Sequence, residues 1–305
     1  MQQIPKNMFE PASVDANEAE KISKPSLSFW KDVGLRFREN KLAMFGVILL
    51  ALLVFMAIFG PLMTPYDYKT NDLMNTNQPP SSEHWFGTDD LGRDVFTRTW
   101  EGARISLFIG LSAALIDLFI GVIWGSISGY RGGRTDEAMM RFADILYGVP
   151  YLLLVILLMV VLEQGLGTMI LAMTITGWIN MARIVRGQVL QLKNQEYVMA
   201  AQTLGADTKR ILFKHLIPNS MGPILVTMTL TIPSAIFTEA FLSYLGLGVP
   251  APLASWGTMA SDGLPALEYY PWRLFFPATF ICLTILAFNV IGDGLRDALD
   301  PKLRK

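Results

Sequence analysis

QEYVMAAQTLGAD, at residues 195–207, is a short polar and amphipathic island between two long apolar segments. Four of its residues recur at helical spacing and predict a short helix with one shared face: Tyr197, Ala200, Ala201 and Leu204. Asn194 is the expected N-cap of this helix, and Gly205 suits the left-handed position that closes it. Asp207 is then the expected cap of a second helix that leads into the next apolar segment.

The small-residue face of this short helix has two interpretations. In the first, this face docks into a groove on another protein. In the second, the helix lies on lipid headgroups at the membrane surface. Periodicity alone leaves both open.

Composition places the chain in a membrane. Of its 305 residues, 52% are hydrophobic and 17% are charged, whereas soluble domains average about 25% charged residues. The single cysteine, Cys282, excludes an intrachain disulfide. The first apolar run begins only after about forty polar residues, which is too late for an ordinary cleaved signal peptide, so we expect it to remain as a membrane span.

Six apolar runs approach the length of about 20 residues that a helix needs to cross a bilayer. They are residues 42–63, 105–130, 145–162, 164–182, 216–238 and 274–292. The third and fourth meet in an expected tight hairpin at 163–167. The sequence therefore predicts an all-α integral membrane protein with six transmembrane helices.

Positive charge sets the orientation of these helices. With the N-terminus inside, 20 of the 25 Lys and Arg residues fall in cytoplasmic segments and 5 in outer segments. Cytoplasmic loops carry the excess of Lys and Arg, so we expect both termini in the cytoplasm. Residues 1–27 read as a flexible tail, and 28–41 as a basic amphipathic helix on the inner surface.

The first outer segment, residues 64–104, is long and contains the turn-rich run HWFGTDDLGRD at 84–94. His84 near Asp89, Asp90 and Asp94 has two readings, a metal site or a solvated turn, and one His among acids favours the turn. A second outer segment, from residue 240 to 272, is apolar with Pro and Gly, so we expect it to fold back onto the protein.

The second span carries an unusual pattern of small residues. Gly121, Gly125 and Gly129 recur every four residues, a spacing that lets membrane helices approach closely, although membrane helices are also generally rich in glycine. Asp117 lies in the middle of the same span, where a carboxylate is costly, so we expect it to face the bundle or a water-filled cavity. We interpret it as structural or cavity-lining rather than as a proton carrier.

Proline interrupts two spans, at Pro150 in the third and at Pro218, Pro223 and Pro233 in the fifth. Such positions either break helices that line a pathway or only curve them. The chain has no phosphate loop of the form G-x-x-x-x-G-K-[ST] and no H-E-x-x-H, so we expect it neither to bind ATP nor to be an enzyme.

Three separate stretches now carry a family resemblance. Ala200-Ala201, Gly205 and Pro218 resemble the cytoplasmic loop signature of ABC importer permeases, with Met199 at the usual Glu position and His215 and Ile217 replacing the usual Ile and Leu. The runs 84–94 with 102–107, and 239–248 with 255–257, resemble the oligopeptide and dipeptide branch. The resemblance covers residues 28 to 305.

This resemblance implies the type I ABC importer permease fold. It divides the chain into a tail with a basic helix (1–41), a first helix (42–63), a long outer loop (64–104), a five-helix core (105–292) with a cytoplasmic coupling loop (183–215), and a cytoplasmic tail (293–305). The implied coupling residues are Glu196, Tyr197, Ala200, Ala201, Leu204 and Gly205, and Asp117 is the candidate cavity-lining residue.

The resemblance also implies partners. They are a second permease, two ABC ATPases that bind ATP and Mg, an extracytoplasmic peptide-binding protein, the oligopeptide substrate and the lipids of a bacterial cytoplasmic membrane. No nucleic acid, cofactor or metal is expected on this chain. Two alternatives stay open: a permease of the same branch for dipeptides, nickel or another solute, and an ion-coupled secondary transporter.

Overall fold

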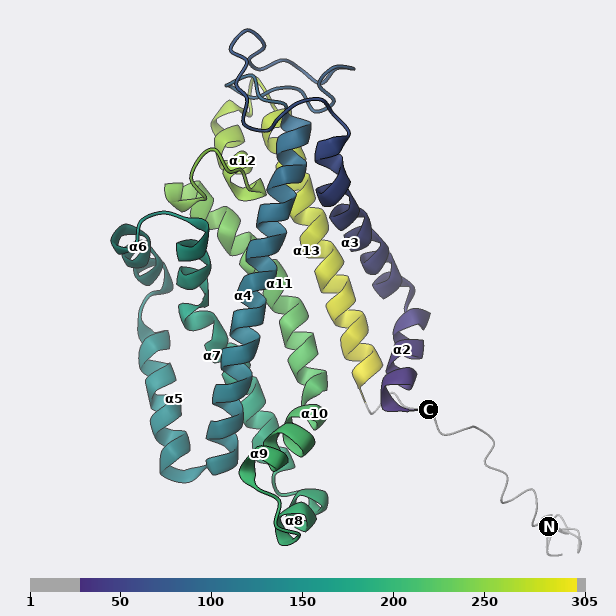
Figure 1. Ribbon diagram of the computed structural model, residues 1–305, viewed down its shortest axis with the longest axis vertical. Helices are drawn as coiled ribbons and strands as arrows, with labels where there is room; N and C mark the ends of the chain where they lie inside the picture. Colours follow the sequence, from purple (N-terminus) through teal and green to yellow (C-terminus); the bar gives the residue numbers. More distant parts are fainter. Residues whose placement is uncertain (1–27, 301–305) are drawn as a thin grey trace, which may run out of the picture.

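The computed structural model describes residues 28–300, and the predicted flexible tail at 1–27 and the end of the predicted C-terminal tail at 301–305 lie outside them. Within the described residues, every regular element is helical (Figure 1). The α-helices are α2 (Phe29–Glu39), α3 (Lys41–Phe59), α4 (Val95–Arg131), α5 (Gly133–Gly148), α6 (Tyr151–Val161), α7 (Leu166–Leu192), α8 (Glu196–Thr203), α9 (Thr208–Arg210), α10 (Ile217–Asn219), α11 (Met221–Leu242), α12 (Trp256–Gly263) and α13 (Trp272–Leu299). There are also two π-helical turns: Ile211–Leu216 directly precedes α10, and Ser243–Leu247 directly follows α11.

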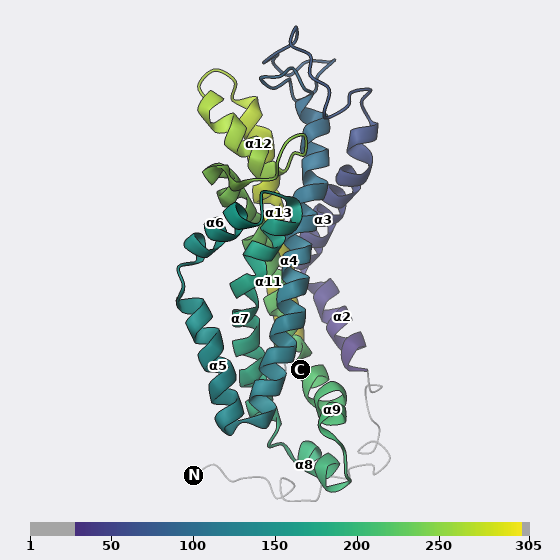
Figure 2. The same ribbon diagram turned by 60° about the vertical axis from the view of Figure 1, so that its left-hand side comes forward.

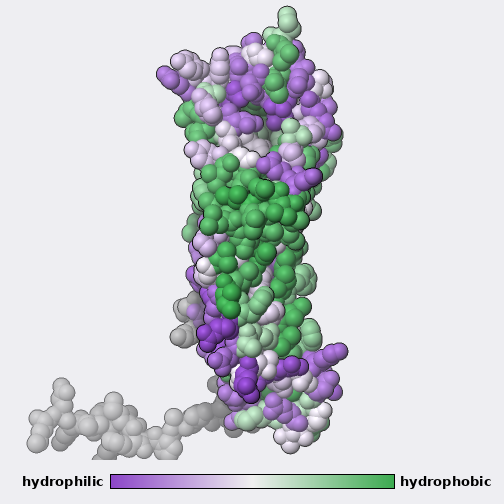
Figure 3. All heavy atoms as spheres, turned by 90° about the vertical axis from the view of Figure 1, so that its left-hand side faces the viewer, coloured by the Kyte–Doolittle hydropathy of each residue, from purple (hydrophilic) through white to green (hydrophobic). Residues whose placement is uncertain are grey.

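The long helices run side by side in an elongated bundle (Figures 1 and 2). Helices α8 and α9 lie at one end, and α12 lies with the segment before α4 at the other. Apolar side chains gather around the middle of the face seen in Figure 3, with hydrophilic side chains toward both ends. This distribution matches a bilayer around the middle of the bundle.

Five helices in the described part are long and apolar enough to cross a membrane, and one bent pair makes a sixth crossing if its two halves count as one. The five spans are Lys41–Leu62, Val95–Arg131, Leu166–Leu192, Met221–Leu247 and Trp272–Leu299. The predicted helical membrane protein is therefore confirmed, with a difference in its third span.

The third predicted span, residues 145–162, is not one helix. Helices α5 and α6 meet there at 80°. Pro150 precedes the first residue of α6, and Val149 before it is extended, with ψ of 128°. Proline has no N–H to continue the helical ladder and forces its predecessor out of the helical region. Pro150 thus breaks the span rather than curving it.

Three predicted spans were too short, because the helix in the structure extends beyond the predicted boundary in each case. Helix α4 begins at Val95 rather than at 105, α7 continues to Leu192 rather than ending at 182, and α13 continues to Leu299 rather than ending at 292. Hydropathy marks where lipid begins, whereas a helix ends where its hydrogen bonds end. Asp94 supplies the missing signal at the start of α4, since its side chain accepts from Thr97 N at 2.7 Å.

Helices α4 and α7 are packed with their backbones in close approach along the predicted glycine stripe. A Cβ at Gly121 would lie 2.6 Å from the Met181 Cβ, and one at Gly129 would lie 2.9 Å from the Arg186 carbonyl oxygen. At Gly125 it would overlap the Ala182 carbonyl oxygen. These three glycines therefore set the distance between the two helices.

The segment before α4 is an ordered loop, but the reading of His84 and its neighbouring acids as a solvated turn was wrong. Asp89 is buried and pairs with Arg93 at 2.7 Å and Arg98 at 3.3 Å. His84 Nδ1 lies 2.9 Å from a carboxylate oxygen of the buried Asp94. No group of three or more His, Cys, Asp or Glu placed to hold a metal occurs among residues 28–300.

Candidate functional site

Helix α8 is held to the bundle by one buried side chain. Val198 is fully buried in a cluster with residues of α7 and of the π-helical turn Ile211–Leu216. The N-cap is Gln195, so the prediction of Asn194 was wrong by one residue. Gly205 has φ of 80°, and the Gly205 and Ala206 N–H groups donate to the carbonyls of Gln202 and Ala201. The predicted left-handed closure of this helix is confirmed.

The predicted shared face of α8 points away from the bundle. Leu204 is 88% exposed and Tyr197 is 40% exposed. Glu196, Ala200 and Gly205 are also exposed, and Ala201 is half-buried. Partial burial raises the pKa of the Tyr197 phenol above its ordinary value. Helix α8 thus presents an apolar face at the end of the bundle that no described residue covers.

Polar contacts anchor this end of the molecule. Arg186 of α7 donates two hydrogen bonds of 2.6 Å each to the carboxylate of Asp136 in α5, which also accepts from Ser128 of α4. Lys193 donates to the Gly129 carbonyl at 2.8 Å. A two-pronged Arg–carboxylate pair fixes geometry as well as charge. These contacts tie the end of α7, just before α8, to α4 and α5.

Asp207 at the start of α9 accepts a hydrogen bond from Arg210 N at 2.9 Å, which confirms it as the predicted cap. The π-helical turn Ile211–Leu216 follows and leads through Pro218 to α11. The chain thus turns back into the bundle within a few residues of α8.

A cavity of about 480 Å³ with a mixed polar and apolar lining, called the polar cavity below, opens between α4, α6, α7, α11 and the end of α13. Its polar lining consists of Asp117, Tyr151, Thr176, Asn180, Thr227, Thr231, Ser234, Thr238 and Arg296. The four hydroxyl residues of α11 follow one another at spacings of four, three and four, so they form a single polar stripe on that helix. Polar side chains inside a membrane bundle mark solute pathways. This cavity is the candidate pathway, and Asp117 lies on its wall.

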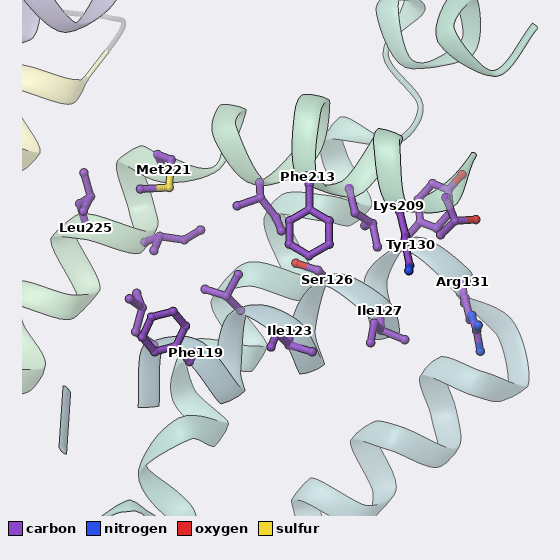
Figure 4. A pocket seen from close by; sticks show the side chains of 16 residues that line it. Phe119, Ile123, Ser126, Ile127, Tyr130, Arg131, Lys209, Phe213, Met221 and Leu225 are labelled. Atoms are coloured by element: carbon purple, nitrogen blue, oxygen red, sulfur yellow. The ribbon is translucent and has the colours of Figure 1, made fainter. Parts of the chain in front are cut away.

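A second hollow of about 530 Å³ lies between α4 and the segment 208–225 (Figure 4). Phe119, Ile123 and Ile127 project into it from α4, and Phe213 projects from the opposite side. Its lining is apolar apart from a few groups such as Arg131 and Lys209. Such a lining offers few hydrogen bonds to a polar solute. The polar cavity is therefore the better candidate for the pathway of such a solute.

Glu239 was expected just outside the fifth span, but α11 includes it and buries it fully. Its carboxyl group accepts hydrogen bonds from Ser255 at 2.6 Å, Ser243 at 2.9 Å and Ser106 at 3.3 Å. Gly257 allows the close approach, since a Cβ there would lie 2.7 Å from a Glu239 oxygen. Sequence reasoning missed this network, which joins α4 and α12 to the outer end of α11.

A helical bundle with an apolar belt, a polar cavity and an exposed apolar helix at one end has the features that a transport permease requires. The fold agrees with this class. A chain of the MetNI methionine ABC transporter, in an inward facing conformation, superposes with a TM-score of 0.54 over 65% of this chain and 94% of that chain, at 16% identity. The type I ABC importer permease fold predicted from the sequence is confirmed.

The chain belongs to the family described as binding-protein-dependent transport system inner membrane component, whose model matches residues 121–305. A second model, the N-terminal TM domain of oligopeptide transport permease C, matches residues 28–80. The chain is 76% identical to the oligopeptide transport system permease protein OppC of Bacillus subtilis over the whole of both chains. It is 60% identical to the dipeptide transport system permease protein DppC of the same organism, over 99% of this chain and 95% of that one.

Proposed function

We propose that this chain is a non-catalytic permease subunit of an ATP-driven ABC importer for oligopeptides. The observation that carries the proposal is the 76% identity, over its full length, to a relative named as an oligopeptide permease. The polar cavity supports it, because a peptide backbone needs hydrogen-bonding groups along its path. Membership of a binding-protein-dependent family favours this role over an ion-coupled secondary transporter.

The proposed mechanism couples ATP hydrolysis in partner subunits to the cavity through α8. Two ATPases, which bind ATP and Mg, receive the exposed face formed by Tyr197, Ala200 and Leu204. Their closure displaces α8, and the anchors from Lys193 to Gly129 and from Arg186 to Asp136 carry the motion into the helices that line the cavity. A second, homologous permease completes the wall on the open side of the cavity.

The outer end is the proposed docking surface for a peptide-binding protein. Leu73 and Met74 are exposed there, in the segment before α4. Asp89 does not contribute to docking, since it is buried among arginines, whereas Asp90 is exposed. The proposed location is a bacterial cytoplasmic membrane, with α8 and both termini on the cytoplasmic side.

Peptide uptake by the complete transporter tests this function. The chain, the second permease, both ATPases and the receptor are reconstituted in liposomes with radiolabelled peptides of two to six residues. We expect accumulation inside the liposomes that requires both ATP and receptor. Faster uptake of dipeptides than of longer peptides would favour the dipeptide alternative. Uptake without ATP, driven by an ion gradient, would contradict the proposal.

Labelling of single cysteines tests the orientation. In a Cys282→Ser background, Ser81→Cys lies in the exposed outer segment and Gln191→Cys lies exposed near the end of α7. We expect a membrane-impermeant maleimide added to intact cells to label position 81 and to label position 191 only after the cells are opened. Labelling of position 191 from outside would reverse the topology.

A further inference from the structure

The carboxylate of Asp117 is buried on the wall of the polar cavity without a partner for one of its oxygens. The residue is 6% exposed. Within residues 28–300, no hydrogen-bond donor reaches its Oδ1 atom, which is itself buried. Buried polar atoms in proteins are nearly always hydrogen-bonded, so each exception calls for an explanation.

No described cation pairs with this carboxylate. Arg296 is the cationic residue among the described lining residues, and its Nη1 atom lies 3.8 Å from Asp293 Oδ1 of its own helix. An acidic group inside a membrane protein is costly unless it pairs with a cation or serves a passing solute. Oδ1 itself is closed off from the cavity, so a solute would meet this carboxylate at its other oxygen, Oδ2, and no described residue pairs with the group.

The structure makes room for the carboxylate at this position. Asp117 of α4 packs against Gly177 of α7, and a Cβ at Gly177 would lie 2.7 Å from Oδ1 and 2.8 Å from the carboxyl carbon. Any larger residue at 177 would displace the carboxylate. The absence of a side chain at residue 177 thus leaves the space that the carboxylate occupies.

The groups around Asp117 suit an ammonium ion. An ammonium group donates three hydrogen bonds and accepts none. The same cavity presents side-chain oxygens from three further directions, on Tyr151 of α6, on Thr176 and Asn180 of α7, and on Thr231 of α11. A carboxylate with several neutral oxygens matches a primary ammonium better than it matches a second anion or an apolar group.

We propose that Asp117 binds the α-ammonium group at the amino end of the peptide during its passage. This inference rests on the proposed function and deepens it by naming which part of the substrate is recognised. Every peptide with a free amino terminus carries this group whatever its side chains, so one carboxylate serves many sequences. Because the interaction is a charge-assisted hydrogen bond in a medium of low dielectric, its loss weakens recognition strongly.

Uptake of matched peptides tests the proposal. The complete transporter is reconstituted in liposomes, and the receptor is loaded to saturation with a lysine-free peptide carrying either a free or an acetylated amino terminus. Uptake is normalised to measured receptor occupancy. We expect the wild-type transporter to import the free peptide at least tenfold faster than the acetylated one. In Asp117→Asn, which keeps the size of the side chain, we expect that ratio to fall to about one because uptake of the free peptide slows.

Two further variants separate binding from general damage. Gly177→Ala keeps the charge but displaces the carboxylate, so we expect the same loss of discrimination. Glu137→Gln removes an equal charge from an exposed site on α5 and should leave the ratio unchanged. An unchanged ratio in Asp117→Asn, or equal uptake of the two peptides by the wild type, overturns the inference. Failure of the wild type to import either peptide would instead overturn the proposed function.

Discussion

Leu204→Asp is expected to reduce peptide-stimulated ATP hydrolysis at least tenfold while leaving the permease folded in the membrane. Leu204 is 88% exposed at the end of α8, so its replacement removes almost no packing within the chain. Exposed substitutions of this kind usually change stability by about 0.5 kcal/mol or less. If this face fills an ATPase groove, however, the new carboxylate would be buried there without a partner. The free-energy cost to binding the ATPase would then be several-fold larger than this change in stability. ATP hydrolysis by the reconstituted complex, with and without loaded receptor, measures the effect.

Gln202→Glu is the matched control for this variant. It places the same charge on the same helix, but Gln202 faces the bundle, where its amide lies 3.4 Å from the Tyr130 hydroxyl. We expect it to retain stimulation. The alternative reading, that α8 lies on lipid headgroups, predicts unaltered stimulation in Leu204→Asp. It also predicts that Ala200→Trp is tolerated, since tryptophan favours the interface. Full stimulation in Leu204→Asp would remove α8 as the coupling element.

Gly125→Leu is expected to destabilise the permease by about 3 kcal/mol or more, at the upper end of the usual cost of overpacking. A Cβ at this position overlaps the Ala182 carbonyl oxygen and lies 3.0 Å from both the Arg186 nitrogen and the Val185 Cβ. Backbone atoms cannot move aside as a flexible side chain can, so α4 and α7 have to separate. The fraction of detergent-solubilised protein that stays monodisperse after heating measures the loss.

Gly187→Leu provides the comparison on the other helix of the same pair. A Cβ at Gly187 meets no described atom within 4 Å, while the change in helix propensity is the same as at Gly125. We expect thermal stability close to that of the wild type. Equal stability in Gly125→Leu and Gly187→Leu would show that the two helices do not depend on the glycine contact.

Much of the fold was predictable from hydropathy because lipid contact is a local property of each segment. The bilayer-embedded parts of α3, α4, α7, α11 and α13 follow from apolar length alone. Their extensions were not predictable in this way, since the polar first turns of α4 and the last turns of α7 and α13 are helical by hydrogen bonding outside the lipid. Pro150 was recognised as a possible break, but an 80° bend depends on what α6 packs against.

In the candidate site, too, local features were predictable and contacts between distant residues were not. Helix α8, the closing Gly205 and the cap at Asp207 were predicted from residues that lie close together in the sequence. The pair of Arg186 with Asp136 joins positions 50 residues apart, and the bond from Ser106 to Glu239 joins positions 133 apart. A single sequence gives no means of matching such partners. Asp117 was recognisable as a buried charge, but its lack of a partner emerged only when its neighbours were placed.

The Glu239 network joins α12 to α4 at the end of the bundle opposite α8. Ser106 and Ser255 bind the same carboxyl group, and the Trp256 N–H groups donate to Ser106 Oγ at 3.0 Å and to the Thr99 carbonyl at 2.9 Å. Helix α12 is thereby fastened to α4, whose 37 residues extend for about 55 Å. A tilt of about 5° imposed beside α8 then displaces the outer end by roughly 5 Å. Under the proposed coupling through α8, small movements at that end of the bundle would be amplified into a change in width at the opposite end.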